Sequence, residues 1–264
     1  MPMLRYAANL TMLFNEVPFL ERFERAAAAG FKAVEFLFAH NVDQDGVERE
    51  LRHHDLELVL FDPEAGDFPA GERGYLCDPR RTDHLLKTVE AAIRTAGRLG
   101  CRRLNILAGN RVDGIGDAEM RRTVVGNLKR AAPLARAAGI TLLIEALNTW
   151  ESPRYFLDGS RLGLDLVREV GEPNVRFQYD CYHLQRMEGQ LIDGLTKNLE
   201  WIGHVQIADV PGRHEPGTGE INYVNVLRAL EASGYAGYVG LEYRPSTRTE
   251  DSLAWLPLGA RGRR

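Results

Sequence analysis

Short apolar runs alternate along this chain with longer segments of helical period. The apolar runs have the length and composition of buried strands, and each gap between them has room for a helix. Eight runs predict strands: Leu4–Leu10, Ala33–Leu37, Leu56–Phe61, Arg103–Leu107, Ile140–Glu145, Val175–Asp180, His204–Ala208 and Tyr238–Tyr243. Repeated strand–helix units are typical of a parallel sheet covered by helices. Eight of them predict an α/β fold in which the sheet closes into a (β/α)₈ barrel.

The segments between the runs carry start and stop signals for helices. A helix is predicted from about Thr82 to Gly100, where a glycine suits the end. The next helix begins near Asp117, whose side chain can cap it. Its apolar stripe includes Pro133, which lacks the backbone donor that a helix needs. We therefore expect a kink or an early break at this proline.

The composition favours one large domain. The chain has 264 residues, of which 44% are hydrophobic, enough to bury a large core. No low-complexity linker divides it, so residues 1–258 are predicted to form a single barrel domain. The last residues, 259–264, read "GARGRR" and predict a disordered basic tail.

The net charge limits the kinds of binding partner that are expected, and the cysteines indicate the cellular compartment. The formal net charge is -4, which gives no general field to attract nucleic acid or an anionic membrane. The three cysteines are far apart and form no CxxC motif, as expected of a reducing compartment. No signal peptide or membrane-spanning run is recognisable. We expect a cytoplasmic protein with a small-molecule substrate; the sequence leaves open whether it is a homo-oligomer.

Four successive predicted strands deliver polar oxygen donors. The fifth, sixth and eighth present Glu145, Asp180 and Glu242, and the seventh presents Gln206. One strand-end acid is ordinarily a cap or a salt-bridge partner, but the carboxyl ends of all barrel strands meet at one mouth. Carboxylates gathered there would repel one another and lose hydration unless a cation compensated them. Oxygen donors favour Mg²⁺ or Mn²⁺, so the pattern predicts a divalent metal site.

Six segments spread over nearly the whole chain carry a further signal. They are "AANLTMLFNEVPFLERF", "AGERG", "GITLLIEALNT", "FQYDCYHLQRMEG", "HVQIADVPGRHEPGTGEINY" and "GYVGLEYRP". Together they resemble the hydroxypyruvate isomerase family of xylose isomerase-like TIM barrels. The resemblance implies that Glu145, Asp180, Gln206 and Glu242 hold the metal. It also implies that Glu145 and Glu242 are the catalytic proton-transfer pair. The implied activity is an aldose–ketose type isomerisation, with hydroxypyruvate to tartronate semialdehyde through an enediolate as the leading reaction.

Three further residues are candidates for binding the hydroxy-keto acid substrate. His183 follows Asp180 closely and can hydrogen-bond a substrate oxygen. Arg213, in a loop rich in glycine and proline, offers a two-pronged donor for a carboxylate. Glu151 resembles the accessory acid of related epimerases. Each residue could instead be an ordinary structural or solvated side chain.

Several departures from the family pattern keep other substrates open. The family more often has proline where Ala146 stands and arginine where Trp150 stands, and "LFDPEAGDF" also differs. The alternatives are a 2-oxo-tetronate isomerase, a ketose 3-epimerase and an inosose dehydratase-type lyase. A distant alternative is a nuclease like endonuclease IV, which the seven histidines and the acidic balance disfavour. A binding protein without activity is disfavoured because the whole set of ligands is present.

Overall fold

Eight parallel strands form a closed barrel in the computed structural model, which describes residues 3–263. Neighbouring strands follow the order of the sequence, and β8 pairs with β1 to close the sheet. The strands are β1 (Arg5–Asn9), β2 (Ala33–Phe38), β3 (Glu57–Asp62), β4 (Arg103–Asn105), β5 (Thr141–Glu145), β6 (Val175–Asp180), β7 (Ile202–Ile207) and β8 (Tyr238–Leu241). The predicted (β/α)₈ barrel is confirmed.

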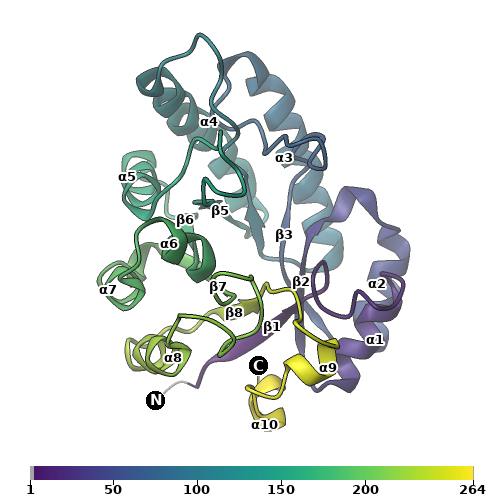
Figure 1. The fold of residues 1–264 in the computed structure, drawn as a ribbon. Coiled ribbons are helices and arrows are strands. Elements are labelled where there is room, and N and C mark those ends of the chain that lie inside the picture. The colour runs from purple at the N-terminus through teal and green to yellow at the C-terminus, as the bar shows by residue number, and fades with distance from the viewer. Residues whose placement is uncertain (1–2, 264) are drawn as a thin grey trace.

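Helices surround the barrel, as Figure 1 shows. The α-helices are α1 (Glu21–Ala28), α2 (Gln44–His53), α3 (Thr82–Leu99), α4 (Asp117–Ala137), α5 (Ser160–Val170), α6 (Cys181–Met187), α7 (Leu191–Lys197), α8 (Tyr223–Ala232), α9 (Thr249–Ser252) and α10 (Leu258–Arg261). Short 3₁₀ helices are η1 (Ala39–Asn41), η2 (Pro79–Arg81) and η3 (Leu199–Trp201). Among the described residues, none of the helices combines the length and the apolar character needed to cross a membrane.

The register of the strands places the predicted ligands at one end of the barrel. Glu145 pairs with Gln178 across β5 and β6, and Asp180 pairs with Gln206 across β6 and β7. Glu242 directly follows the last residue of β8. Since all the strands are parallel, their carboxyl ends point the same way. The four predicted metal ligands therefore share one mouth.

The expected break at Pro133 is wrong, because α4 runs through this residue to Ala137. A proline removes one backbone hydrogen bond, but packing can hold the helix on both sides of it. Leu128 and Ala131 before the proline and Ala135 after it are all buried. The helix predicted from Thr82 is confirmed, and it ends at Gly100 in the left-handed conformation.

The expected disordered tail is also wrong for residues 259–261, which belong to α10. Arg261 donates hydrogen bonds to the backbone carbonyl oxygens of Leu253 at 2.8 Å, Leu256 at 2.9 Å and Ala29 at 3.2 Å. A basic residue that appears solvated in the sequence thus fastens the C-terminal segment to the turn after α1. Composition alone does not reveal such backbone acceptors.

Candidate active site

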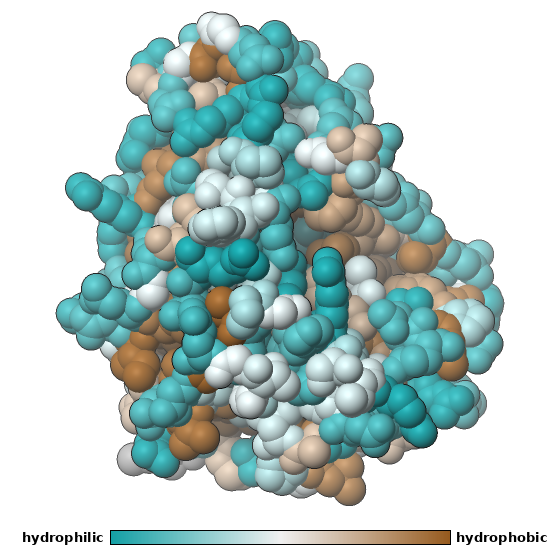
Figure 2. Space-filling model, in the orientation of Figure 1, coloured by the Kyte–Doolittle hydropathy of each residue, from teal (hydrophilic) through white to brown (hydrophobic). Residues whose placement is uncertain are grey.

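A cavity of about 610 Å³ opens at the carboxyl ends of the strands. It is lined by Glu145, Glu242, His183, Arg213 and Glu151 among other residues. Figure 2 shows a hollow near the centre of one face of the molecule, bordered by both hydrophilic and hydrophobic residues. The cavity therefore combines the predicted proton-transfer pair with all three predicted substrate contacts.

Two buried acids each have one oxygen without a hydrogen-bond partner. Glu145 accepts hydrogen bonds at Oε2 from Asn105 at 2.8 Å and from Gln178 at 3.0 Å, whereas its Oε1 has no partner among the described residues. Asp180 accepts the backbone N–H of Tyr182 at Oδ1 at 2.7 Å, and its Oδ2 likewise has none. Buried carboxylate oxygens are costly when left unpaired. A divalent cation would satisfy both, so this donor set fits a hard metal ion.

His183 lies close to these two acids, but its hydrogen bonds indicate that it is a hydrogen-bond donor rather than a metal ligand. Glu145, Asp180 and His183 offer possible ligand atoms that lie within 4.8 Å of one another. Nδ1 of His183 accepts the backbone N–H of Asn148 at 3.0 Å, which assigns the proton of the neutral ring to Nε2. Burial lowers the pKa of His183 well below its usual value. The neutral ring therefore turns an N–H, rather than a lone pair, toward Oδ2 of Asp180, which lies 3.6 Å away.

Burial and mutual repulsion raise the pKa values of the acids at the mouth. Burial raises the pKa of Glu242 to about 8, against the opposing charge of Arg213. Burial also raises the pKa of Glu145 well above its usual value, and the charges of Glu242 and Asp180 add to this. The pKa of Asp180 is raised by burial as well. Without a metal, Glu242 retains its proton near neutral pH.

We expect the metal-free protein to lose stability as the pH rises from 6.5 to about 8. The ordinary pKa of Glu242 is 4.5 and its folded value is about 8, so the folded chain keeps a proton that the unfolded chain has released. This contribution to stability is complete below pH 4.5 and is lost as the pH rises through 8. His183 acts in the opposite sense, but only below its ordinary pKa of 6.5. The measurement is the thermal midpoint of chelator-treated protein across this range.

Glu242→Gln is the matched control for this pH dependence, because glutamine has no proton to release. The fall in thermal midpoint should be smaller in this variant, and it should also shrink when Mg²⁺ is added, since a bound cation replaces the proton. A wild-type midpoint that stays constant or rises over the same range would contradict the raised pKa of Glu242.

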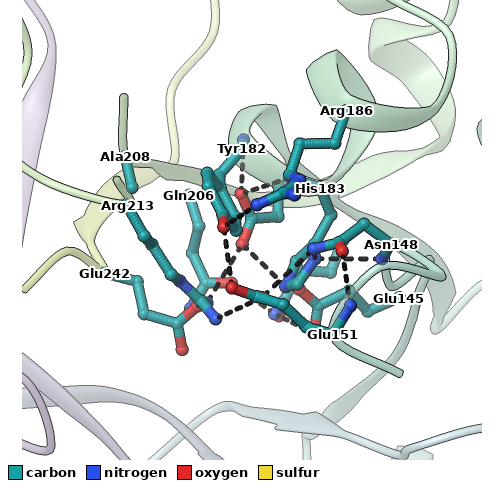
Figure 3. A network of polar contacts seen from close by, with 12 residues as sticks. Glu145, Asn148, Glu151, Tyr182, His183, Arg186, Gln206, Ala208, Arg213 and Glu242 are labelled. Carbon is teal, nitrogen blue, oxygen red and sulfur yellow. Dashed lines mark hydrogen bonds and ion pairs between the residues drawn. The ribbon is translucent and has the colours of Figure 1, made fainter. Parts of the chain in front are cut away.

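Arg213 lies among the acids of the site, as Figure 3 shows. Its Nη2 donates to Oε2 of Glu242 and lies 3.7 Å from Oδ2 of Asp180. Its Nη1 lies 3.7 Å from Oε2 of Glu151. The sequence suggested that both prongs of Arg213 would be open to a substrate carboxylate. In the structure one prong is already paired with Glu242, so Arg213 also balances the charge of the acids.

Asp209 shapes the loop that carries Arg213. Its carboxylate accepts four backbone N–H groups at 2.9 to 3.0 Å, from Val210, Gly217, Gly219 and Ile221. Arg213 itself has a φ of 57°, a left-handed conformation that non-glycine residues rarely adopt. The buried carboxylate at the end of β7 thus holds a strained turn in place. This explains how a loop residue reaches an acid at the end of β8.

Glu151 closes one side of the same network. Oε1 accepts the hydroxyl of Tyr182 at 2.8 Å, and Oε2 accepts the side-chain amide of Asn148 at 3.2 Å. Partial burial by itself would raise the pKa of Glu151, but the bond from Tyr182 and the charge of Arg213 lower it below its usual value. Glu151 is therefore an ionised acid at the wall of the cavity, where the sequence placed a substrate contact.

A second layer of buried polar residues lies beneath the site, and the sequence analysis missed it. Its members are Asn9, Glu35, Asn105, Gln178 and His204. Nε2 of Gln178 donates to Oε2 of Glu145 at 3.0 Å and to Oε1 of Gln206 at 2.7 Å. Gln206 in turn donates to Glu35 at 2.8 Å, and Glu35 contacts His204 at 2.7 Å. This layer fixes the orientation of the Gln206 amide.

A sequence signal for this layer exists in the two-residue period of strands. Gln178 and His204 each stand two positions before a predicted ligand, Asp180 and Gln206. Side chains two apart on a strand point to the same face, which here is the barrel interior. Polar residues at such positions must find partners inside the barrel. The two-residue period thus gives Gln178 and His204 a signal in the sequence.

Comparisons with known proteins agree with the fold and with the resemblance found in the sequence. The chain is 46% identical over 254 residues to the hydroxypyruvate isomerase of Escherichia coli (strain K12), covering 96% of this chain and 98% of that protein. It is 42% identical over 252 residues to the 2-oxo-tetronate isomerase of Cupriavidus necator, covering 96% of this chain and 97% of that protein. A solved structure named AP endonuclease, family 2, from Brucella melitensis superposes with a TM-score of 0.93 at 45% identity, covering 96% of this chain and 98% of that chain. Residues 23–258 match the family model described as xylose isomerase-like TIM barrel, and the chain therefore belongs to this family.

Proposed function

We propose that this chain is a metal-dependent isomerase of small hydroxy-keto acids, with hydroxypyruvate and tartronate semialdehyde as the leading pair. The observation that carries the proposal is the pair of buried glutamates, Glu145 and Glu242, which line one cavity and have raised pKa values. They come from β5 and from the end of β8, strands that are not neighbours in the barrel. The identities of the relatives support the same class of reaction.

The reaction needs two proton-handling groups that can exchange roles. A proton leaves one substrate carbon and another returns to the adjacent carbon, so one group must be ionised while the other is protonated. The hydroxyl proton also moves from one substrate oxygen to the other, so that the former hydroxyl becomes the new carbonyl. Glutamates with raised pKa values can hold or release a proton near neutral pH. Both glutamates line the cavity, and Glu242 is held by Arg213 and by Asn9. Either glutamate can act first, depending on the direction of the reaction.

The metal and the remaining side chains complete the proposed site. Mg²⁺ or Mn²⁺, held by Glu145, Asp180, Gln206 and Glu242, would supply Lewis-acid stabilisation of negative charge on the substrate oxygens of an enediolate. His183 donates from Nε2 to a substrate oxygen. Arg213 and Glu151 contact polar groups of the substrate at the cavity wall. The three buried, unpaired cysteines fit a cytoplasmic location.

An activity screen tests the proposal. Purified protein with Mg²⁺ or Mn²⁺ is expected to convert hydroxypyruvate to tartronate semialdehyde. Proton NMR monitors this conversion. 2-oxo-tetronates and neutral ketoses serve as the alternative substrates of the same fold. A duplex DNA with an abasic site tests the nuclease alternative. Cleavage of this DNA without isomerisation of any of these compounds would overturn the proposal.

A further inference from the structure

Arg73 is a second arginine of the cavity, and its position is fixed on three sides. It lines the cavity together with Glu145 and Glu242. Nε donates to the hydroxyl of Ser152 at 3.2 Å, and Nη1 donates at 2.8 Å to the backbone carbonyl oxygens of Phe68 and Glu72. The guanidinium carbon lies 3.9 Å from the centre of the Phe68 ring. Such a side chain is already organised for binding before any ligand arrives.

The backbone next to Arg73 is equally constrained. Gly74 has a φ of +90°, and an added Cβ would lie 2.4 Å from the carbonyl oxygen of Leu107. Only glycine fits both the conformation and this close approach. Gly74 also forms an isolated bridge with Ala108, just beyond β4. The loop that carries Arg73 is thus anchored to the barrel rather than free to swing.

Arg73 differs from Arg213 in having no ion pair with an acid among the described residues, although the more distant charge of Glu151 acts against the effect of burial on its pKa. Arg213 is paired with Glu242, whereas no ion pair joins Arg73 to an acid within residues 3–263. Nη2 of Arg73 also has no hydrogen-bond acceptor in this part of the chain. Burial lowers the pKa of Arg73. The guanidinium of Arg73 stays charged although it is partly buried. An anionic ligand bound in the cavity would supply the counter-ion that it lacks.

We propose that Arg73 binds the carboxylate of the 2-oxo acid substrate and thereby selects acids over neutral ketoses. This inference rests on the proposed isomerase function and assigns the substrate class within the same site. Its free Nη2 forms a charge-assisted hydrogen bond to the carboxylate, while Phe68 and Ser152 hold the guanidinium in place. Arg213 is then left at the reacting end of the substrate, where Glu242 already engages it.

A matched pair of substrates tests this assignment. Hydroxypyruvate and dihydroxyacetone differ only in a carboxylate that replaces a hydroxymethyl group, and both can pass through an enediolate or enediol. In Arg73→Ala, kcat/KM for hydroxypyruvate should fall about 10- to 100-fold, because a charge-assisted bond is lost. The value for dihydroxyacetone should change less than about threefold. Arg73→Lys keeps the positive charge but lacks the planar guanidinium. Its kcat/KM for hydroxypyruvate should lie between those of the wild type and Arg73→Ala.

Arg94→Ala is the control variant, because Arg94 is an exposed arginine of α3 that does not line the cavity. Water screens an exposed charge, so both substrates should change less than about threefold. A binding measurement complements the kinetics: the unreactive acid D-glycerate should bind wild-type protein with Mg²⁺ by calorimetry and bind Arg73→Ala about 10- to 100-fold more weakly. The melting curve of each variant verifies that it is folded.

The results separate this inference from the proposed function. The inference fails if kcat/KM of Arg73→Ala falls equally for hydroxypyruvate and dihydroxyacetone, or if this variant binds D-glycerate as tightly as the wild type does. Arg73 would then only support its loop. If the wild type isomerises neither substrate, the proposed function fails, and the calorimetry alone then decides whether Arg73 binds a carboxylate. If Arg73→Ala does not fold, Arg73→Lys decides: an equal change in kcat/KM for hydroxypyruvate and for dihydroxyacetone in that variant would overturn the inference.

Discussion

Glu145→Gln and Glu242→Gln are each expected to lose about 10²- to 10⁴-fold in turnover or more, even with metal bound. Glutamine keeps an oxygen that can contact a cation, but it has no basic carboxylate to take the substrate proton. Both positions are buried at the cavity, so solvent cannot easily replace the missing group. The measurement is kcat at saturating metal, with the metal content of each variant determined separately.

Gln206→Ala is the matched control for these two variants. The amide of Gln206 has no proton-transfer role in this account, although it accepts from Gln178 and donates to Glu35 in the layer beneath the site. Its removal should lower metal affinity and still leave measurable turnover at saturating metal. A loss in Gln206→Ala as large as that of the glutamate variants, with metal bound, would contradict the separation of the two roles.

Removal of the divalent ion is expected to abolish turnover, the second large effect. A cation would satisfy the unpaired oxygens of Glu145 and Asp180, and in the proposed mechanism it would also stabilise the enediolate as a Lewis acid. Treatment with a chelator should remove one metal ion per chain together with the activity. Addition of Mg²⁺ or Mn²⁺ should restore both. Full activity in protein shown by elemental analysis to be free of metal would contradict this account.

The fold and the mouth of the barrel could be predicted from the sequence, because they follow from periodicity. Each buried strand is a short apolar run, and parallel strands must end at the same side. Val175–Asp180 agrees residue for residue with β6. The predicted strands end two residues beyond β4 and β8, because nothing in the sequence marks where the ladder of hydrogen bonds stops. The predicted side chains at the mouth do not depend on these two ends.

The partners of the site residues could not be predicted, because they depend on packing in three dimensions. The pairing of Arg213 with Glu242 requires a loop with left-handed backbone geometry, which no local pattern specifies at an arginine. The contact of Glu35 with His204 joins β2 to β7 through the barrel interior. Contacts between distant strands follow from the closed sheet, and the single sequence carries no direct signal for them.

The most direct test of the central claim is the exchange of the substrate's carbon-bound proton with solvent deuterium. It is measured by NMR on hydroxypyruvate in D₂O, with metal occupancy confirmed for the wild type, Glu145→Gln and Glu242→Gln. The account predicts rapid exchange in the wild type and a loss of exchange by about 10²-fold or more in at least one glutamine variant. If both variants exchange the proton at the wild-type rate, neither Glu145 nor Glu242 is the base, and the proposed mechanism is wrong.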